Sequence, residues 1–80
     1  MKKFYYHIVF LSDNKTEYVI NDTDKYGIIV VSNGTTIRVN NVRIPQGVTD
    51  LTSDTMQDMT TYTIRLEPPD TAVIFIKKMA

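Results

Sequence analysis

Short apolar runs alternate with short polar stretches along the chain, and no segment shows the sustained hydrophobic period of a long helix. Runs of aromatic and β-branched residues that are bounded by turn-forming residues predict strands. The predicted strands are Phe4–Leu11, Thr16–Ile20, Gly27–Ser32, Thr35–Val39, Val42–Ile44, Tyr62–Glu67 and Ala72–Lys77. Their number and spacing predict an all-β fold, a small sandwich or partly open barrel of six or seven short antiparallel strands.

Three polar turns are expected to join successive strands into hairpins. Ser12–Lys15 has turn chemistry, so the first two strands are expected to pair. Asn33-Gly34 is a strong two-residue hairpin signal, and Asn40-Asn41 suits a type I′ turn because asparagine tolerates positive φ. The last two turns together predict a three-stranded meander over residues 27–44.

The nine residues 36–44 read almost as a mirror image about Asn40-Asn41. A tight turn at that point sets Arg38 directly opposite Arg43. Two like charges opposite each other destabilise a hairpin. Either an anionic group therefore offsets them, or the two side chains splay apart into water.

Two predicted strands are apolar on both faces, namely Phe4–Leu11 and the run Ile28–Val31. A strand of this kind is central in its sheet or is covered by a partner. The chain is therefore expected either to form a homo-oligomer or to carry a hydrophobic contact site.

The segment 48–61 is the one long stretch without a strand pattern. Ser53 or Asp54 is a candidate N-cap, which predicts one short helix near 53–59, with its body over Thr55–Met59. Apolar residues in the same segment, such as Leu51, would anchor that helix over one end of the sheet.

Size and composition limit the possible functions. Eighty residues make a single domain, 1–80, and the absence of cysteine excludes disulfides and fits a cytoplasmic protein. The apolar stretch after Met1–Lys3 is too short for a signal peptide or a membrane span, so no membrane partner is expected. A net charge of zero argues against nucleic acid as the main partner, because that affinity comes mostly from neutralising phosphates.

The chain lacks the groups that enzymes combine in catalysis. His7 is the one histidine and lies within an apolar run, and the three glycines are scattered rather than gathered in a phosphate loop. Asp22–Asn33 begins like a calcium loop but has asparagine at the twelfth position, where a bidentate glutamate is expected. We therefore expect no catalysis, no metal and no cofactor.

All three arginines, Arg38, Arg43 and Arg65, stand between two aliphatic residues on predicted strands. If the strand of Arg65 lies beside the meander, the three guanidinium groups converge on one sheet face. Guanidinium groups bind carboxylates and phosphates through paired hydrogen bonds. With Tyr62, which begins the strand of Arg65, they form the candidate binding site, and an acidic partner is expected there.

These features favour a non-enzymatic binding module that acts through a sheet face or edge on another protein with an acidic surface. Small cysteine-free chains of this type are common among the accessory and inhibitor proteins of bacteriophages. Two alternatives stay open. Tyrosines among the strands are also typical of a small β-barrel that stacks single-stranded nucleic acid, and the arginines suit a pocket for a small anionic ligand such as a nucleotide.

Overall fold

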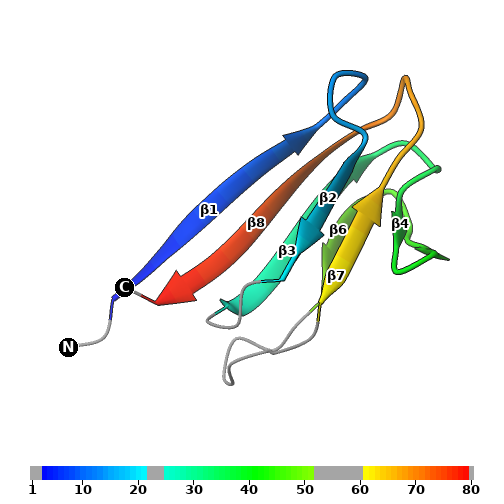
Figure 1. Ribbon diagram of the computed structural model, residues 1–80. Coiled ribbons are helices and arrows are strands. Elements are labelled where there is room, and N and C mark those ends of the chain that lie inside the picture. The colour runs from blue at the N-terminus through cyan, green and yellow to red at the C-terminus, as the bar shows by residue number, and fades with distance from the viewer. Residues whose placement is uncertain (1–2, 22–24, 52–60, 80) are drawn as a thin grey trace.

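The computed structural model describes residues 3–21, 25–51 and 61–79, and every regular element in these ranges is a strand (Figure 1). The strands are β1 (Phe4–Leu11), β2 (Glu17–Ile20), β3 (Lys25–Asn33), β4 (Arg38–Val39), β5 (Val42–Arg43), β6 (Gly47–Asp50), β7 (Tyr62–Arg65) and β8 (Thr71–Met79). The predicted all-β class is confirmed. The predicted short helix near 53–59 lies outside the described residues.

The strands form two four-stranded sheets packed face to face, so the predicted sandwich is confirmed (Figure 1). One sheet has the order β1-β8-β3-β6 and is called the β1 sheet below. The other has the order β2-β7-β4-β5 and is called the β2 sheet. All pairings are antiparallel.

The strand pairings follow one rule, in which β1 pairs with β8, β2 with β7, β3 with β6 and β4 with β5. The chain is thus one long hairpin whose two arms are wound together, as in an eight-stranded jelly roll. Its tip is Asn40-Asn41, and partners lie at nearly equal distances in sequence on either side of that pair, from Val39 opposite Val42 to Leu11 opposite Ala72. The mirror-like segment is therefore the turning point of the whole fold.

The turn at the tip has the geometry that the sequence predicts. Asn40 and Asn41 have φ angles of 50° and 69°, and Arg38 pairs with Arg43 across the turn. The backbone N–H of Ile44 donates to the carbonyl of Ile37 at 3.1 Å, which fixes the next step of the register. Positive φ at both central positions defines the type I′ turn.

The two other predicted hairpins are wrong. The turn at Ser12–Lys15 exists, but β1 and β2 then enter different sheets, and Asn33-Gly34 likewise leads from the β1 sheet to the β2 sheet. A meander would place Ile28 and Ile37 on one face of one sheet. In the sandwich Ile28 lies on the β1 sheet and Ile37 directly precedes β4 of the β2 sheet, and both are fully buried in the core.

The predicted non-strand segment also begins too early, because Gly47–Asp50 forms β6 and pairs with β3. This pairing gives the apolar strand β3 a neighbour on each side, which confirms its predicted central position. Val42 is 66% exposed, although its partner Val39 is buried. It lies on β5, a two-residue strand at the edge of the β2 sheet.

The core lies between the sheets and consists of aliphatic side chains from both arms of the chain. Its buried residues are Val9, Leu11, Ile20, Ile28, Val30, Ile37, Val39, Ile44, Ile64, Leu66, Ala72, Ile74 and Ile76. Because strand residues alternate between faces, the residues between them point outward. Each sheet therefore presents one outer face, and the two outer faces differ in chemistry.

Candidate functional site

The outer face of the β2 sheet carries a row of charged residues that crosses all four strands. In register, Glu17 on β2 pairs with Arg65 on β7, Arg65 with Arg38 on β4, and Arg38 with Arg43 on β5. Arg38, Arg43 and Arg65 are called the arginine row below. The three arginine positions thus meet on adjacent strands, as the sequence led us to expect.

Arg38 lies between Arg43 and Arg65 in the arginine row, and its Cα atom is close to the Cα atoms of both. The Ile44–Ile37 hydrogen bond makes Arg38 and Arg43 a non-hydrogen-bonded pair, in which Cα atoms lie only about 4.5 Å apart. On the other side, the Asn40–Thr63 backbone hydrogen bond makes Arg38 and Arg65 a hydrogen-bonded pair, with Cα atoms about 5.5 Å apart. Arg38 therefore faces a like charge on each side.

One arginine of the row has a carboxylate partner. Arg65 Nε donates to Glu17 Oε2 at 2.6 Å, and both side chains are substantially exposed, at 61% and 43%. An exposed pair of this kind stabilises the fold by about 1 kcal/mol at most. Among the residues that the structure describes, none forms an ion pair with Arg38 or Arg43. Two positive charges on β4 and β5 are thus left without compensation from the described part of the chain.

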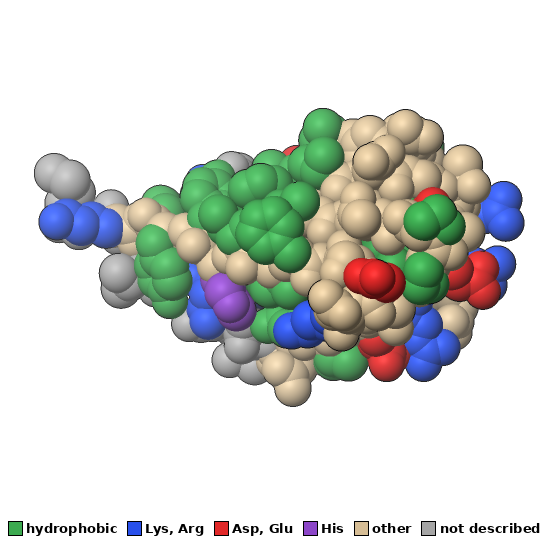
Figure 2. All heavy atoms as spheres, turned by 90° about the horizontal axis from the view of Figure 1, so that it is seen from above, with side chains coloured by type: hydrophobic (Ala, Val, Ile, Leu, Met, Phe, Trp, Pro, Cys, Tyr) green, Lys and Arg blue, Asp and Glu red, His purple; other side chains and the backbone are tan. Residues whose placement is uncertain are grey.

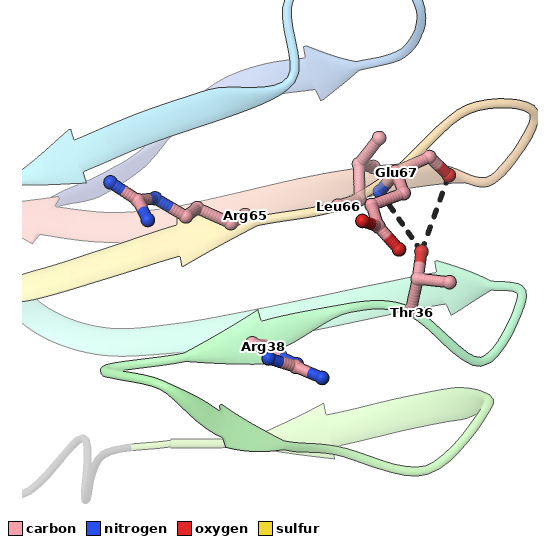
Figure 3. A pocket seen from close by; sticks show the side chains of 5 residues that line it. All are labelled: Thr36, Arg38, Arg65, Leu66 and Glu67. Carbon is pink, nitrogen blue, oxygen red and sulfur yellow. Dashed lines mark hydrogen bonds between the residues drawn. The ribbon is translucent and has the colours of Figure 1, made fainter.

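A shallow pocket opens beside the arginine row between β4 and β7 (Figure 3). Its lining residues are Thr36, Arg38, Arg65, Leu66 and Glu67, and its volume is about 180 Å³. Figure 3 shows the guanidinium groups of Arg38 and Arg65 pointing away from each other.

The structure does not bring Tyr62 to the arginine row. On β7, Tyr62 and Ile64 share the inner side, and Tyr62 packs half-buried against the core, whereas Arg65 points outward. The placement of Tyr62 in a common site with the arginines is therefore wrong. The reason is the two-residue period of the strand, because residues three apart lie on opposite faces.

The remaining aromatic residues also lie away from the arginine row. Tyr18 points inward, where its ring meets that of His7 edge to face at 6.3 Å. Tyr6 packs against Phe75 at 6.4 Å, and both belong to the β1 sheet. No surface that alternates arginine and tyrosine is assembled from these residues.

The outer face of the β1 sheet is apolar over most of its area. One cross-strand row is Phe10–Val73–Val31–Val48, and the next is Ile8–Phe75–Ile29–Asp50. Along β1 the outward positions continue with Tyr6 and Phe4. The apolar face is defined here as Phe4, Tyr6, Ile8, Phe10, Ile29, Val31, Val48, Val73 and Phe75.

Several side chains of the apolar face are well exposed, with Phe10 at 68% and Val48 at 72%. Exposed hydrophobic side chains also gather in a broad patch on the side of the molecule seen in Figure 2. The doubly apolar strands predicted this surface in part. The contributions of Val48 and Val73 were missed because they depend on the order of strands in the sheet.

Other sources of function are sparse. No cluster of three metal-ligating side chains occurs among the described residues, and within these ranges no helix is long and apolar enough to cross a membrane. No family model, curated protein or solved structure matches the chain. The arginine row and the apolar face are therefore the two surfaces of the described residues that point to a function.

Proposed function

We propose that this chain is a non-enzymatic binding module that docks an acidic surface of another protein on the outer face of the β2 sheet. The observation that carries the proposal is the register of the arginine row, which aligns three like charges on adjacent strands. Arg38 and Arg43 are the proposed anchors, because Glu17 already pairs with Arg65.

The energetics of the arginine row support this role. Like charges directly opposite each other on neighbouring strands destabilise a sheet, at a cost of roughly 0.2–1 kcal/mol per pair. A carboxylate that approaches Arg38 and Arg43 removes this repulsion and gains paired charge-assisted hydrogen bonds. Binding thus stabilises an arrangement that is unfavourable in the free protein.

The site has the shape of a surface for a macromolecule rather than a pocket for a small anion. A volume of about 180 Å³ lies below the roughly 300–1,000 Å³ of typical ligand pockets. The splayed guanidinium groups and the presence of Glu67 in the lining also disfavour a nucleotide. Single-stranded nucleic acid has less support as well, because Tyr6 and Tyr26 lie on the β1 sheet, away from the arginines.

The proposed role is that of an accessory or inhibitor protein of the kind that bacteriophages encode, acting in the cytoplasm. Its support is the combination of small size, absence of cysteine and absence of a catalytic constellation in the sequence. Such a protein works by occupying a surface of its target.

Affinity capture from the native host tests the proposal. The bait is the wild-type chain, the Arg38→Gln/Arg43→Gln variant, or a control variant, Lys3→Gln/Lys15→Gln, that changes the net charge equally. We expect a partner that wild type and control retain, that the arginine variant loses, and whose binding weakens with added salt. A partner retained equally by all three baits would refute the arginine row as the docking site, and a nuclease-sensitive partner would instead support nucleic-acid binding.

A further inference from the structure

We propose that the apolar face is the interface between two copies of this chain, packed face to face about a two-fold axis that runs parallel to the strands. This inference is independent of the proposed partner site, which lies on the opposite sheet. It rests on the area and the composition of the apolar face.

The area of the apolar face suits a dimer. An aromatic residue carries roughly 200 Å² of surface. With the exposed fractions of Phe4, Tyr6, Ile8, Phe10 and Val48, the exposed apolar area is on the order of 600 Å². That lies at the upper end of the largest patch on a typical monomer, roughly 300–600 Å², and approaches the roughly 800 Å² per partner of a stable interface.

The composition favours a second copy over a transient partner. In the two rows that cross all four strands, the only charged residue is Asp50, at the β6 edge. Depletion of charge from an apolar core is characteristic of homodimer interfaces, whereas transient interfaces are about as polar as the rest of a surface. The zero net charge of the chain also means that two copies do not repel each other at long range.

Two charged residues lie close to the apolar face. Asp50 lies at the β6 edge, and Lys77 lies on β8 in the row beyond Phe75, with its Nζ 4.5 Å from the centre of the Phe4 ring. A two-fold axis parallel to the strands lays β6 of one copy over β1 of the other, and β8 over β3. Asp50 of each copy then lies over Ile8 of the second copy and Lys77 over Gly27, so no two like charges face each other across the interface.

The same axis matches apolar side chains across the interface. Phe10 of one copy meets Val48 of the other, Val73 meets Val31, and Phe75 meets Ile29. Two sheets that pack in this aligned way lie about 10 Å apart with their strands rotated by about 30°. The resulting stack has four layers, and the arginine rows lie on its two outermost faces, pointing away from each other.

Sedimentation equilibrium and light scattering of the full chain over a wide concentration range test the inference. We expect a dimer for wild type. Phe10→Asp and Val48→Asp should each weaken dimerisation roughly 100-fold or more. Each substitution buries one unpaired carboxylate from each copy in the interface. Val42→Asp is the matched control, since Val42 is an equally exposed valine on the opposite sheet, and it should leave the dimer intact. Arg38→Gln/Arg43→Gln should also remain dimeric.

A charge exchange tests the orientation of the axis. Phe10→Asp and Val48→Lys should each weaken the dimer, and the double variant, which sets each aspartate opposite a lysine of the other copy, should dimerise more tightly than either single variant. Circular dichroism confirms that each variant is folded, and Val48→Asp, on the edge strand β6, keeps the test valid if Phe10→Asp does not fold. A monomeric or trimeric wild type, a dimer insensitive to Phe10→Asp and Val48→Asp, or one broken equally by Val42→Asp would overturn the proposed interface. A double variant that dimerises no more tightly than the single variants would overturn the proposed axis.

Discussion

The Asp70 carboxylate accepts two hydrogen bonds from Thr36, one from its backbone N–H at 2.9 Å and one from its hydroxyl at 2.6 Å. Thr36 belongs to the connection from β3 to β4, and Asp70 to the connection from β7 to β8. Both connections cross between the sheets, and they belong to opposite arms of the long hairpin. The pair therefore fastens the two arms together at one end of the sandwich.

The Thr36–Asp70 contact predicts a specific loss of stability in acid. The two hydrogen bonds from Thr36 lower the pKa of Asp70 below its ordinary value of 3.8. Because this pKa is lower in the folded state than in the unfolded state, the charged Asp70 stabilises the fold at pH values above the pKa of the unfolded state. The stabilisation is lost as the pH falls through the pKa of the folded state. We expect Asp70→Asn to lower Tm at neutral pH and to match wild type more closely well below pH 4, a range set by the ordinary aspartate pKa of about 3.9. Thermal unfolding of both proteins between neutral pH and strong acid measures this difference, and a constant difference across the range would contradict the assignment.

Gly34 packs directly against the same carboxylate, which predicts an unequal response of two glycines to alanine. Gly34 and Gly47 have φ angles of 135° and 111°, so alanine strains the backbone at both, by about 1–3 kcal/mol. At Gly34 an added Cβ also overlaps the Asp70 side chain, whereas at Gly47 it enters open space. Gly34→Ala should therefore destabilise the protein more than Gly47→Ala in denaturant unfolding. Equal losses would show that the Asp70 contact relaxes without cost.

The turn at the tip predicts opposite effects of two asparagine substitutions. Asn-Gly is favoured over Asn-Asn in a type I′ turn, so Asn41→Gly should leave stability unchanged or raise it by a few tenths of a kcal/mol. Asn40→Ala forces alanine into the left-handed region and removes the acceptor of the Thr63 backbone N–H, a hydrogen bond of 2.9 Å. We expect a loss of about 1–2 kcal/mol in the free energy of unfolding. A loss on Asn41→Gly would show that the Asn41 side chain contributes beyond its conformation.

The arginine row predicts that one substitution stabilises the free protein and another does not. Arg38→Gln removes two like-charge contacts and should raise the free energy of unfolding by about 0.4–2 kcal/mol. Arg65→Gln removes one like-charge contact together with the Glu17 ion pair, so its effect should be close to zero. The gain from Arg38→Gln should vanish in concentrated salt, which screens exposed charges. A salt-independent gain would point to packing rather than charge.

Local patterns in the sequence predicted seven of the eight described strands and the tip, but not β6 or the way the chain passes between sheets. The Asn40-Asn41 turn follows from the backbone preference of two adjacent residues, and the pairing of Arg38 with Arg43 follows from the turn. Asn33-Gly34 carries an equally strong local signal, yet the chain crosses there, because turn chemistry does not encode whether the next strand stays in the sheet. That choice depends on burying Ile37 against the opposite sheet, which is a property of the whole core.

The sequence predicted the candidate site only in part. The alignment of Arg65 with Arg38 depends on β7 pairing with β4, a contact between distant segments that no local pattern specifies. The misplacement of Tyr62 was avoidable, since the alternation along β7 already separates Tyr62 and Ile64 from Arg65. The apolar face needed the strand order, because Val48 and Phe10 lie on the two edge strands of one sheet.

The strand pairs enclose one another in sequence, from β4–β5 at the tip to β1–β8 at the ends. This arrangement also sets an order for folding during synthesis. The β4–β5 turn closes a very short loop, whereas β1 finds its partner only across most of the chain, and such long-range closure is entropically costly and slow. In its sheet, β8 separates β1 from β3. The β1 ladder therefore cannot assemble until Thr71–Met79 has left the ribosome, and until then the aromatic residues of β1 remain open to chaperones and to other nascent chains.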